Sequence, residues 1–222
     1  YIDPREPWST RQVKVEKKFK TYMDLRRHME SPYVYGIHAQ KGSSHVTLKG
    51  NTISHHTIGI LMNEGASFII IEDNTIHHCR TGIWTWDNSE DTSATDVVIR
   101  NNRFSHNVFD GIDIRSSARR VKIVDNVFTH NGIKHIAFKE SSRDGQIRNN
   151  KMNSAGYYAE SMPYPGSSAI SLHSLGASAN VLVEHNFQAY QLEPTWDSNG
   201  LIVDLSANTG AIVRFNVFYR NM

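Results

Sequence analysis

Residues 97–128 read VVIRNNRFSHNVFDGIDIRSSARRVKIVDNVF. In this stretch two short apolar runs are each followed by an asparagine, Asn102 and Asn126. Another apolar residue comes two positions after each asparagine, at Phe104 and Phe128. The whole unit therefore repeats after 24 residues, which is a period typical of stacked supersecondary units.

The same unit recurs along most of the chain, with one asparagine in each copy. Successive asparagines are 23, 28, 24, 24, 36 and 30 residues apart: Asn51, Asn74, Asn102, Asn126, Asn150, Asn186 and Asn216. A second register runs beside them: Gly36-Ile37, Gly59-Ile60, Gly82-Ile83, Gly111-Ile112, His135-Ile136, Ala169-Ile170 and Gly200-Leu201. Two or three short strands per repeat indicate a solenoid. We predict an all-β fold, a right-handed parallel β-helix of about seven coils.

The repeat divides the chain into two regions. Residues 1–34 lack it and are predicted to be an N-terminal lead-in or cap, and residues 35–222 are predicted to form the β-helix. The last coil runs to Met222 without a capping segment. Because an uncovered coil leaves backbone groups unpaired, we expect another chain or a missing segment to cover it.

Composition limits the classes of partner. The formal net charge is +2 and no long run of lysine or arginine occurs, so nucleic acid is not expected. No apolar stretch approaches the roughly 18–20 residues that span a bilayer, so no membrane span is expected. The single cysteine, Cys79, excludes an internal disulfide. The chain begins at Tyr1 rather than Met, which leaves open a removed leader or a trimmed sequence. We expect a secreted or periplasmic protein.

Four histidines also recur at a fixed place in the repeat. His55, His78, His106 and His130 each follow their asparagine by four residues, so their rings are predicted to stack. Neighbouring imidazoles can bind a metal, but no carboxylate or cysteine shares this column. A solvated stack at a turn is the favoured interpretation, with a metal site as the alternative, and we predict no metal ligand.

The strand that begins at each Gly-Ile pair carries the most informative surface. Since alternate residues of a strand face opposite sides, inward isoleucines leave two columns facing outward. The first outward column is His38, Leu61, Trp84, Asp113, Ala137, Ser171 and Ile202. The second is Gln40, Asn63, Trp86, Arg115, Lys139, His173 and Asp204.

This outward surface has the side chains of a sugar-binding site. Tryptophan on a flat β-face can stack on sugar rings, while arginine and lysine suit carboxylates. The predicted catalytic residues are Lys139, Arg115, His173 and Asp113. The predicted substrate-binding residues are Trp84, Trp86, Asn63 and Asp204. The alternative is a solvated surface of mixed charge that happens to expose two tryptophans.

Over residues 35–222 the chain resembles right-handed β-helix proteins of bacterial polysaccharide metabolism. One local match is to a strand of mannuronan C5-epimerases that reads Gly-Ile/Phe-Asp-Pro-His-Asp: here it is Gly111-Ile112-Asp113-Ile114-Arg115. Asp113 matches the first aspartate of that strand, and Arg115 stands at its catalytic histidine. In the next coil the resemblance puts Lys139 at an epimerase arginine.

A second local match is to alginate and chondroitin lyases of the β-helix type. Their catalytic lysine lies in a phrase similar to Ile136-Ala137-Phe138-Lys139-Glu140-Ser141-Ser142. His173 stands where the next coil of those lyases supplies an arginine. The resemblance leaves calcium as the one cofactor to consider, although the calcium-binding glutamates of those lyases have no clear counterpart in this chain. No other cofactor is expected.

Together these features predict a protein that acts on a uronate-containing, anionic polysaccharide by removing the proton at C5. Lys139 would be the base, Arg115 would neutralise the carboxylate, and His173 would be the acid or a second base. The sequence leaves lyase and epimerase open. The alternative is a non-catalytic polysaccharide-binding module that uses the same surface, and hydrolysis by paired carboxylates is a third possibility.

Overall fold

The computed structural model describes residues 34–86, 93–157, 167–173, 179–191, 198–204 and 210–221. Every secondary-structure element in these ranges is a β-strand, as predicted. The predicted lead-in over residues 1–34 lies outside the described residues, apart from Val34. Within the described ranges no helix is long and apolar enough to cross a membrane.

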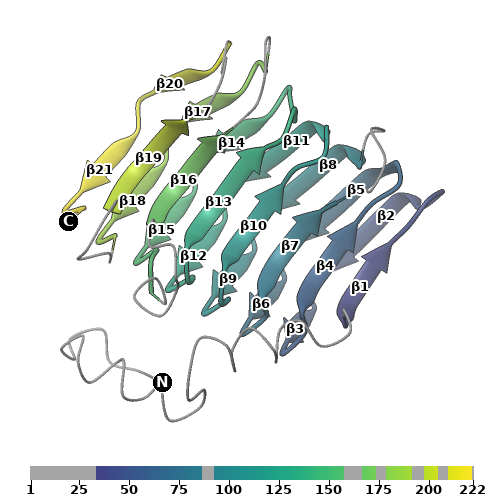
Figure 1. The fold of residues 1–222 in the computed structure, drawn as a ribbon. Coiled ribbons are helices and arrows are strands. Elements are labelled where there is room, and N and C mark those ends of the chain that lie inside the picture. Colours follow the sequence, from purple (N-terminus) through teal and green to yellow (C-terminus); the bar gives the residue numbers. More distant parts are fainter. Residues whose placement is uncertain are drawn as a thin grey trace.

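The strands form three parallel sheets of seven strands each, and the prediction of about seven coils is confirmed (Figure 1). The first sheet contains β1 (Tyr35–Ala39), β4 (Ile58–Met62), β7 (Thr81–Thr85), β10 (Asp110–Ile114), β13 (Lys134–Lys139), β16 (Ser167–His173) and β19 (Ser198–Asp204). The second contains β2 (Ser44–Lys49), β5 (Ala66–Glu72), β8 (Ala94–Arg100), β11 (Arg119–Val124), β14 (Gln146–Arg148), β17 (Leu182–Glu184) and β20 (Ile212–Arg214). The third contains β3 (Thr52–Ser54), β6 (Thr75–His77), β9 (Arg103–Ser105), β12 (Val127–Thr129), β15 (Lys151–Asn153), β18 (Phe187–Ala189) and β21 (Val217–Tyr219).

The core is a set of apolar columns enclosed by the three sheets. Ile83, Ile112 and Ile136 pair in register along the first sheet and are fully buried. On the third sheet the rings of Phe104 and Phe128 stack with centroids 4.9 Å apart. Each coil thus covers the apolar side chains of its neighbours, which is how a solenoid buries a continuous core.

The last coil is different, because its inward-facing side chains are half exposed. Val203, Val213 and Phe218 are 50%, 40% and 46% exposed, whereas their counterparts one coil earlier are fully buried. That another chain or a missing segment covers this coil remains a prediction.

Glycine recurs in the first sheet because neighbouring coils approach too closely for a side chain. A Cβ on Gly59 would lie 2.5 Å from the carbonyl oxygen of Gly82, and one on Gly111 would lie 2.7 Å from that of His135. In β13 this position is His135 itself, whose ring is buried and accepts a hydrogen bond from Nδ2 of Asn131 at 2.9 Å. Burial lowers the pKa of His135 to about 3, so the ring is neutral.

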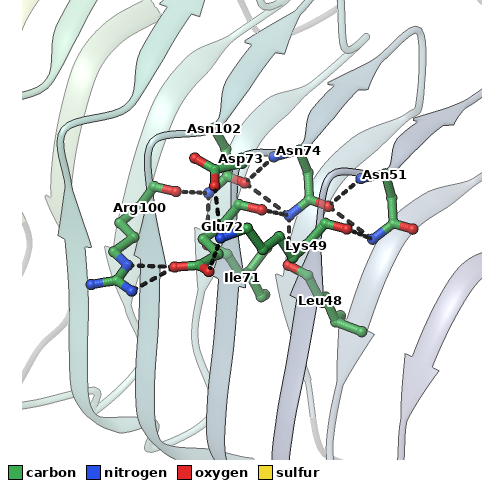
Figure 2. Close-up of polar contacts among 9 residues, drawn as sticks. All are labelled: Leu48, Lys49, Asn51, Ile71, Glu72, Asp73, Asn74, Arg100 and Asn102. Atoms are coloured by element: carbon green, nitrogen blue, oxygen red, sulfur yellow. Dashed lines mark hydrogen bonds and ion pairs between the residues drawn. The ribbon is translucent and has the colours of Figure 1, made fainter.

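The asparagines form a continuous hydrogen-bonded ladder along the axis of the β-helix (Figure 2). Oδ1 of Asn74 accepts from the backbone N–H of Asn51 at 2.8 Å and from its Nδ2 at 3.0 Å. Nδ2 of Asn74 reaches the carbonyl of Leu48 at 2.8 Å and Oδ1 of Asn102 at 3.0 Å. The pattern continues to Asn216. The side chains therefore satisfy backbone groups at every turn of the coil.

Ion pairs on the second sheet follow the same axial direction. Glu72 accepts from Nζ of Lys49 at 2.9 Å and from Nε of Arg100 at 2.8 Å (Figure 2). These hydrogen bonds, that from Lys49 first, lower the pKa of Glu72. Further along, Glu184 lies 2.8 Å from Nε of Arg148 and 2.7 Å from Nε of Arg214. A carboxylate in one coil thus joins cations of the two adjacent coils.

The predicted histidine stack is confirmed. Ring centroids of His55, His78, His106 and His130 are 5.1–5.5 Å apart, and successive rings are within 9° of parallel. All four residues have a φ of 53–62°, a left-handed conformation at the turn after the third-sheet strand. Among the residues that the structure describes, no three metal-binding side chains gather to hold an ion.

Replacing Asn126 with alanine tests the ladder. The side chain satisfies the buried N–H of Asn102 and the carbonyl of Ile99. Each buried group left unpaired costs about 1–3 kcal/mol, so we expect a loss of about 3 kcal/mol or more in the free energy of unfolding. Asn51→Ala is the matched control, because Asn51 is exposed and no described residue donates to its side chain. Urea unfolding measures both, and equal losses would contradict a structural role for the buried ladder.

Acid should destabilise the fold through His106. Burial, together with the nearby His130 and His77, lowers the pKa of His106 to about 4. When the pH falls below about 6.5, the ordinary pKa of histidine, His106 takes up a proton in the unfolded chain but not in the folded chain. The free energy of unfolding therefore decreases as the pH is lowered from about 6.5 to about 4. Asn tolerates the left-handed backbone, and His106→Asn should flatten this pH dependence. Exposed His55→Asn is the control, and the thermal midpoint at several pH values is the measurement. If the thermal midpoint of His106→Asn depends on pH as steeply as that of the wild type, His106 is not the source of the acid destabilisation.

Candidate functional site

The outer face of the first sheet carries the residues on which the sequence prediction rests. β7, β10 and β13 lie side by side there (Figure 1). The register pairs Trp84 with Asp113, and in the next column it pairs Lys139 with His173 and His173 with Asp204. Partners in a parallel pair are about 4.8 Å apart, so side chains from consecutive coils come within reach of one another.

Asp113 is the point on which this face converges. Its side chain is 3% exposed, and its Oδ2 accepts from Nε of Arg115 at 3.1 Å and from Nη2 of the same guanidinium. Nζ of Lys139, one coil further, lies 3.3 Å from the same oxygen. A buried charge is tolerated only when it is paired, and here two coils supply the partners. Asp113 therefore directs Arg115 and Lys139 towards one place.

Arg115 is held by a second acid as well. Its Nη1 lies 3.4 Å from Oε1 of Glu140. Burial alone would lower the pKa of Arg115, but Asp113 and Glu140 outweigh it, so the pKa is raised above its usual value. The guanidinium is thus a permanently charged group in a half-buried position.

Two tryptophans extend the site across β7. The rings of Trp84 and Trp86 stack with centroids 5.5 Å apart at an interplanar angle of 18°. The guanidinium carbon of Arg115 lies 5.1 Å from the centroid of the Trp84 ring. Arginine over an aromatic face is attracted by the ring quadrupole. The arrangement offers a flat aromatic surface beside a fixed positive charge.

The other wall of the site begins at Asp110. In a regular strand Asp110 and Ile112 would share a face, yet Ile112 lies in the core while Asp110 lines a pocket together with Asp113. The alternation breaks at Gly111, where a Cβ would be too close to the next coil. The break turns both carboxyl groups of β10 outward, and Asp110 pairs in register with Lys134.

Residues just before the strands complete this wall. The N–H of Phe109 donates to the carbonyl of Arg80 at 2.7 Å, and the N–H of Ile133 donates to that of Phe109 at 2.8 Å. The guanidinium carbon of Arg80 lies 4.9 Å from the centroid of the Phe109 ring. Between this wall and the strands is a pocket of about 260 Å³. Six polar or aromatic residues of the strands line it, together with Arg115 directly after β10: Thr81, Trp84, Asp110, Asp113, Lys134 and Lys139.

The two carboxyl groups of the pocket have different surroundings. Asp110 is 7% exposed, and burial raises its pKa, which Lys134 lowers in part and Asp113 raises further. The net shift of the pKa of Asp110 is upward. Its Oδ1 is buried and has no hydrogen-bond partner among the described residues, and the same holds for Oδ1 of Asp113. Two carboxyl oxygens thus remain for a ligand.

The structure brings together only part of the set predicted from the sequence. Trp84, Asp113, Arg115 and Lys139 line the pocket. Trp86 adjoins it by stacking on Trp84.

The other three predicted residues lie beyond the lining of this pocket. The His173 side chain is 36% exposed, with Nδ1 4.0 Å from Oδ2 of Asp204. At the opposite side Oδ1 of Asn63 lies 3.1 Å from Nε2 of His38.

Sequence reasoning missed Asp110, Lys134, Arg80 and Phe109, which line the same pocket. The columns assigned from the sequence begin at the Gly-Ile pairs, so neither Asp110 nor the turn residues before it were assigned to any face. The signal that could have identified Asp110 is Gly111, since glycine inside a strand marks a local break in the pleat.

Comparison with known proteins agrees with this architecture. The family described as right handed beta helix region matches residues 29–218. The crystal structure of an alginate lyase from Paenibacillus sp. str. FPU-7 superimposes with a TM-score of 0.62 at 19% sequence identity, over 84% of this chain and 70% of that one. No curated protein matches the chain.

At 19% identity the likeness to the alginate lyase shows a shared fold. The family match spans most of the chain and agrees with the three seven-stranded parallel sheets. The predicted handedness and coil number are therefore confirmed, and the protein belongs to the right-handed beta helix family.

Proposed function

We propose that this protein processes a uronate-containing polysaccharide by removing the proton at C5. The observation that carries the proposal is the convergence of Arg115 and Lys139, from adjacent coils, on the buried carboxylate of Asp113 beside Trp84. The shared fold with a protein named as an alginate lyase supports a polysaccharide as the substrate class. Such a substrate fits the predicted secreted or periplasmic location.

Charge supports an anionic ligand. Four cationic side chains line the pocket, Arg80, Arg115, Lys134 and Lys139, against two carboxyl groups, Asp110 and Asp113. This excess of positive charge in a half-buried site attracts a carboxylate. The stacked tryptophans offer the flat apolar surface on which a sugar ring rests.

The chemistry follows from these positions. Arg115 pairs with the carboxylate of the uronate and stabilises the negative charge that develops when the C5 proton leaves. Lys139 is the base, and it acts in its neutral form because only a free amine accepts a proton. Asp113 orients both side chains. His173, next to Lys139 in register, keeps the role predicted from the sequence, that of an acid or second base.

Two outcomes can follow proton removal. Elimination of the glycosidic bond gives a lyase, and return of a proton from the opposite face gives an epimerase. A binding module without turnover would use the same cationic pocket and aromatic surface. It is the alternative against which the proposal is tested.

Replacing Lys139 distinguishes these functions. Arginine keeps the charge but is never deprotonated in proteins, so Lys139→Arg should retain binding of the polymer and lose the base. We expect turnover to fall by about 10²–10⁴-fold in Lys139→Arg and Lys139→Ala. Uronate polymers are incubated with each protein in deuterated water and followed by NMR. Alkene signals identify a lyase, and deuterium at C5 without cleavage identifies an epimerase.

Binding is measured separately for each variant by calorimetry with the same polymers. Retained affinity without turnover in Lys139→Arg supports the base assignment. A wild-type protein that binds but gives neither product would make the binding module the correct function. Full turnover in Lys139→Ala would exclude Lys139 as the base.

A further inference from the structure

Asp110 is a buried acid for which the predicted mechanism has no role. It lines the pocket with Asp113, three positions along the same strand, but the two carboxyl groups have different partners. Asp113 is hydrogen-bonded to Arg115 and lies beside Lys139. Asp110 pairs in register with Lys134, and its burial disfavours the charged form of the carboxyl group. Pairs of titratable groups with opposed surroundings are typical of acid and base assignments in active sites.

Building on the proposed function, we propose that Asp110 is the general acid that protonates the leaving glycosidic oxygen, which makes the reaction an elimination. Lys139 takes the proton from C5, and the electron pair of that C–H bond forms the C4=C5 double bond. The C4–O4 bond breaks, and the proton of the Asp110 carboxyl group goes to O4. The products are an unsaturated uronate end and a free hydroxyl on the departing sugar. Solvent returns a proton to Asp110 and removes one from Lys139.

The geometry supports this role in two ways. Asp110 and Lys139 line one pocket from adjacent coils, so a single sugar unit of the polymer can contact both. Oδ1 of Asp110 is buried without a hydrogen-bond partner among the described residues. A buried polar atom of this kind is costly unless a ligand satisfies it. Burial also raises the pKa of Asp110, which is the direction that a proton donor needs.

Two competing assignments fit the structure less well. A divalent cation between Asp110 and Asp113 would face Arg115, Lys134 and Lys139, whose positive charges oppose it. His173, the acid predicted from the sequence, is one-third exposed and lies beyond the lining of the pocket. Asp110, which is 7% exposed and lines the pocket, is therefore better placed to donate a proton to a ligand bound there.

Infrared spectroscopy tests the protonation of Asp110 without any substrate. A protonated carboxyl group has a C=O band well separated from those of carboxylates. At neutral pH we expect this band in the wild-type protein and its loss in Asp110→Asn, with circular dichroism confirming that the variant is folded. A band that persists unchanged in Asp110→Asn, or is missing from the wild type, overturns the proposal.

The leaving group tests the catalytic role. With a natural uronate polymer, Asp110→Asn should lose about 10²–10⁴-fold in kcat, the range expected for a general acid. A synthetic uronoside with fluoride at C4 needs no proton to depart, so there the loss should shrink to within about tenfold of wild type. His173→Asn is the comparison. The ratio of its turnover of the fluoride substrate to its turnover of the polymer should match the same ratio for the wild type.

The outcomes separate the two proposals. A wild type that forms no alkene and incorporates no deuterium at C5 refutes C5 proton abstraction, and the role of Asp110 falls with it. Alkene formation that Asp110→Asn leaves intact, or reduces equally for both substrates, refutes only the role of Asp110. Rescue by fluoride in His173→Asn instead would assign the proton to His173.

Discussion

The hydrogen bonds of the asparagine ladder run from coil to coil along the axis, and the positions of all other columns depend on them. Each buried amide accepts from the coil before it and donates to the coil after it, as Asn102 and Asn126 do. A coil that shifted by one residue would leave these groups unpaired in a site without water. The ladder therefore fixes the register, and the register decides which side chains meet on the outer face.

The outer face of the first sheet shows what this register achieves. Arg115 and Lys139 belong to different coils, yet both reach the same oxygen of Asp113. No local sequence motif has to hold them together, because the stacking distance does so. The break at Gly111 adds Asp110 to the same pocket by turning one further side chain of β10 outward. Rigid strands position all four groups, which suits a site whose chemistry needs fixed charges.

Much of the fold could be predicted from the sequence, because a repeated signal averages out local exceptions. The asparagines and the Gly-Ile pairs identified the coils, their number and the columns of the first sheet, and the structure fixes three strands per coil where the sequence left two or three open. The site was less accessible. Alternation correctly gave the column of Trp84 and Asp113, but it was applied only from each Gly-Ile pair onward and so did not reach Asp110. Arg80 and Phe109 lie before the strands, where no periodicity indicates direction. Alternation also gives direction and not burial: Asp113 and Ala137 lie in the outward column and are nevertheless buried.

The stacked coils have a consequence for how this protein could vary in length. The two pocket residues proposed to act on the substrate at C5 or O4, Lys139 and Asp110, come from β13 and β10, and Trp84 comes from the adjacent β7. A coil duplicated or deleted outside these three changes the length of the rod and leaves the pocket as it is, since each coil contacts only its neighbours. A coil inserted between β10 and β13 would separate Lys139 from Asp113 by about one further strand spacing of 4.8 Å. The chemistry of the pocket therefore constrains the number of coils only at two places, between β7 and β10 and between β10 and β13.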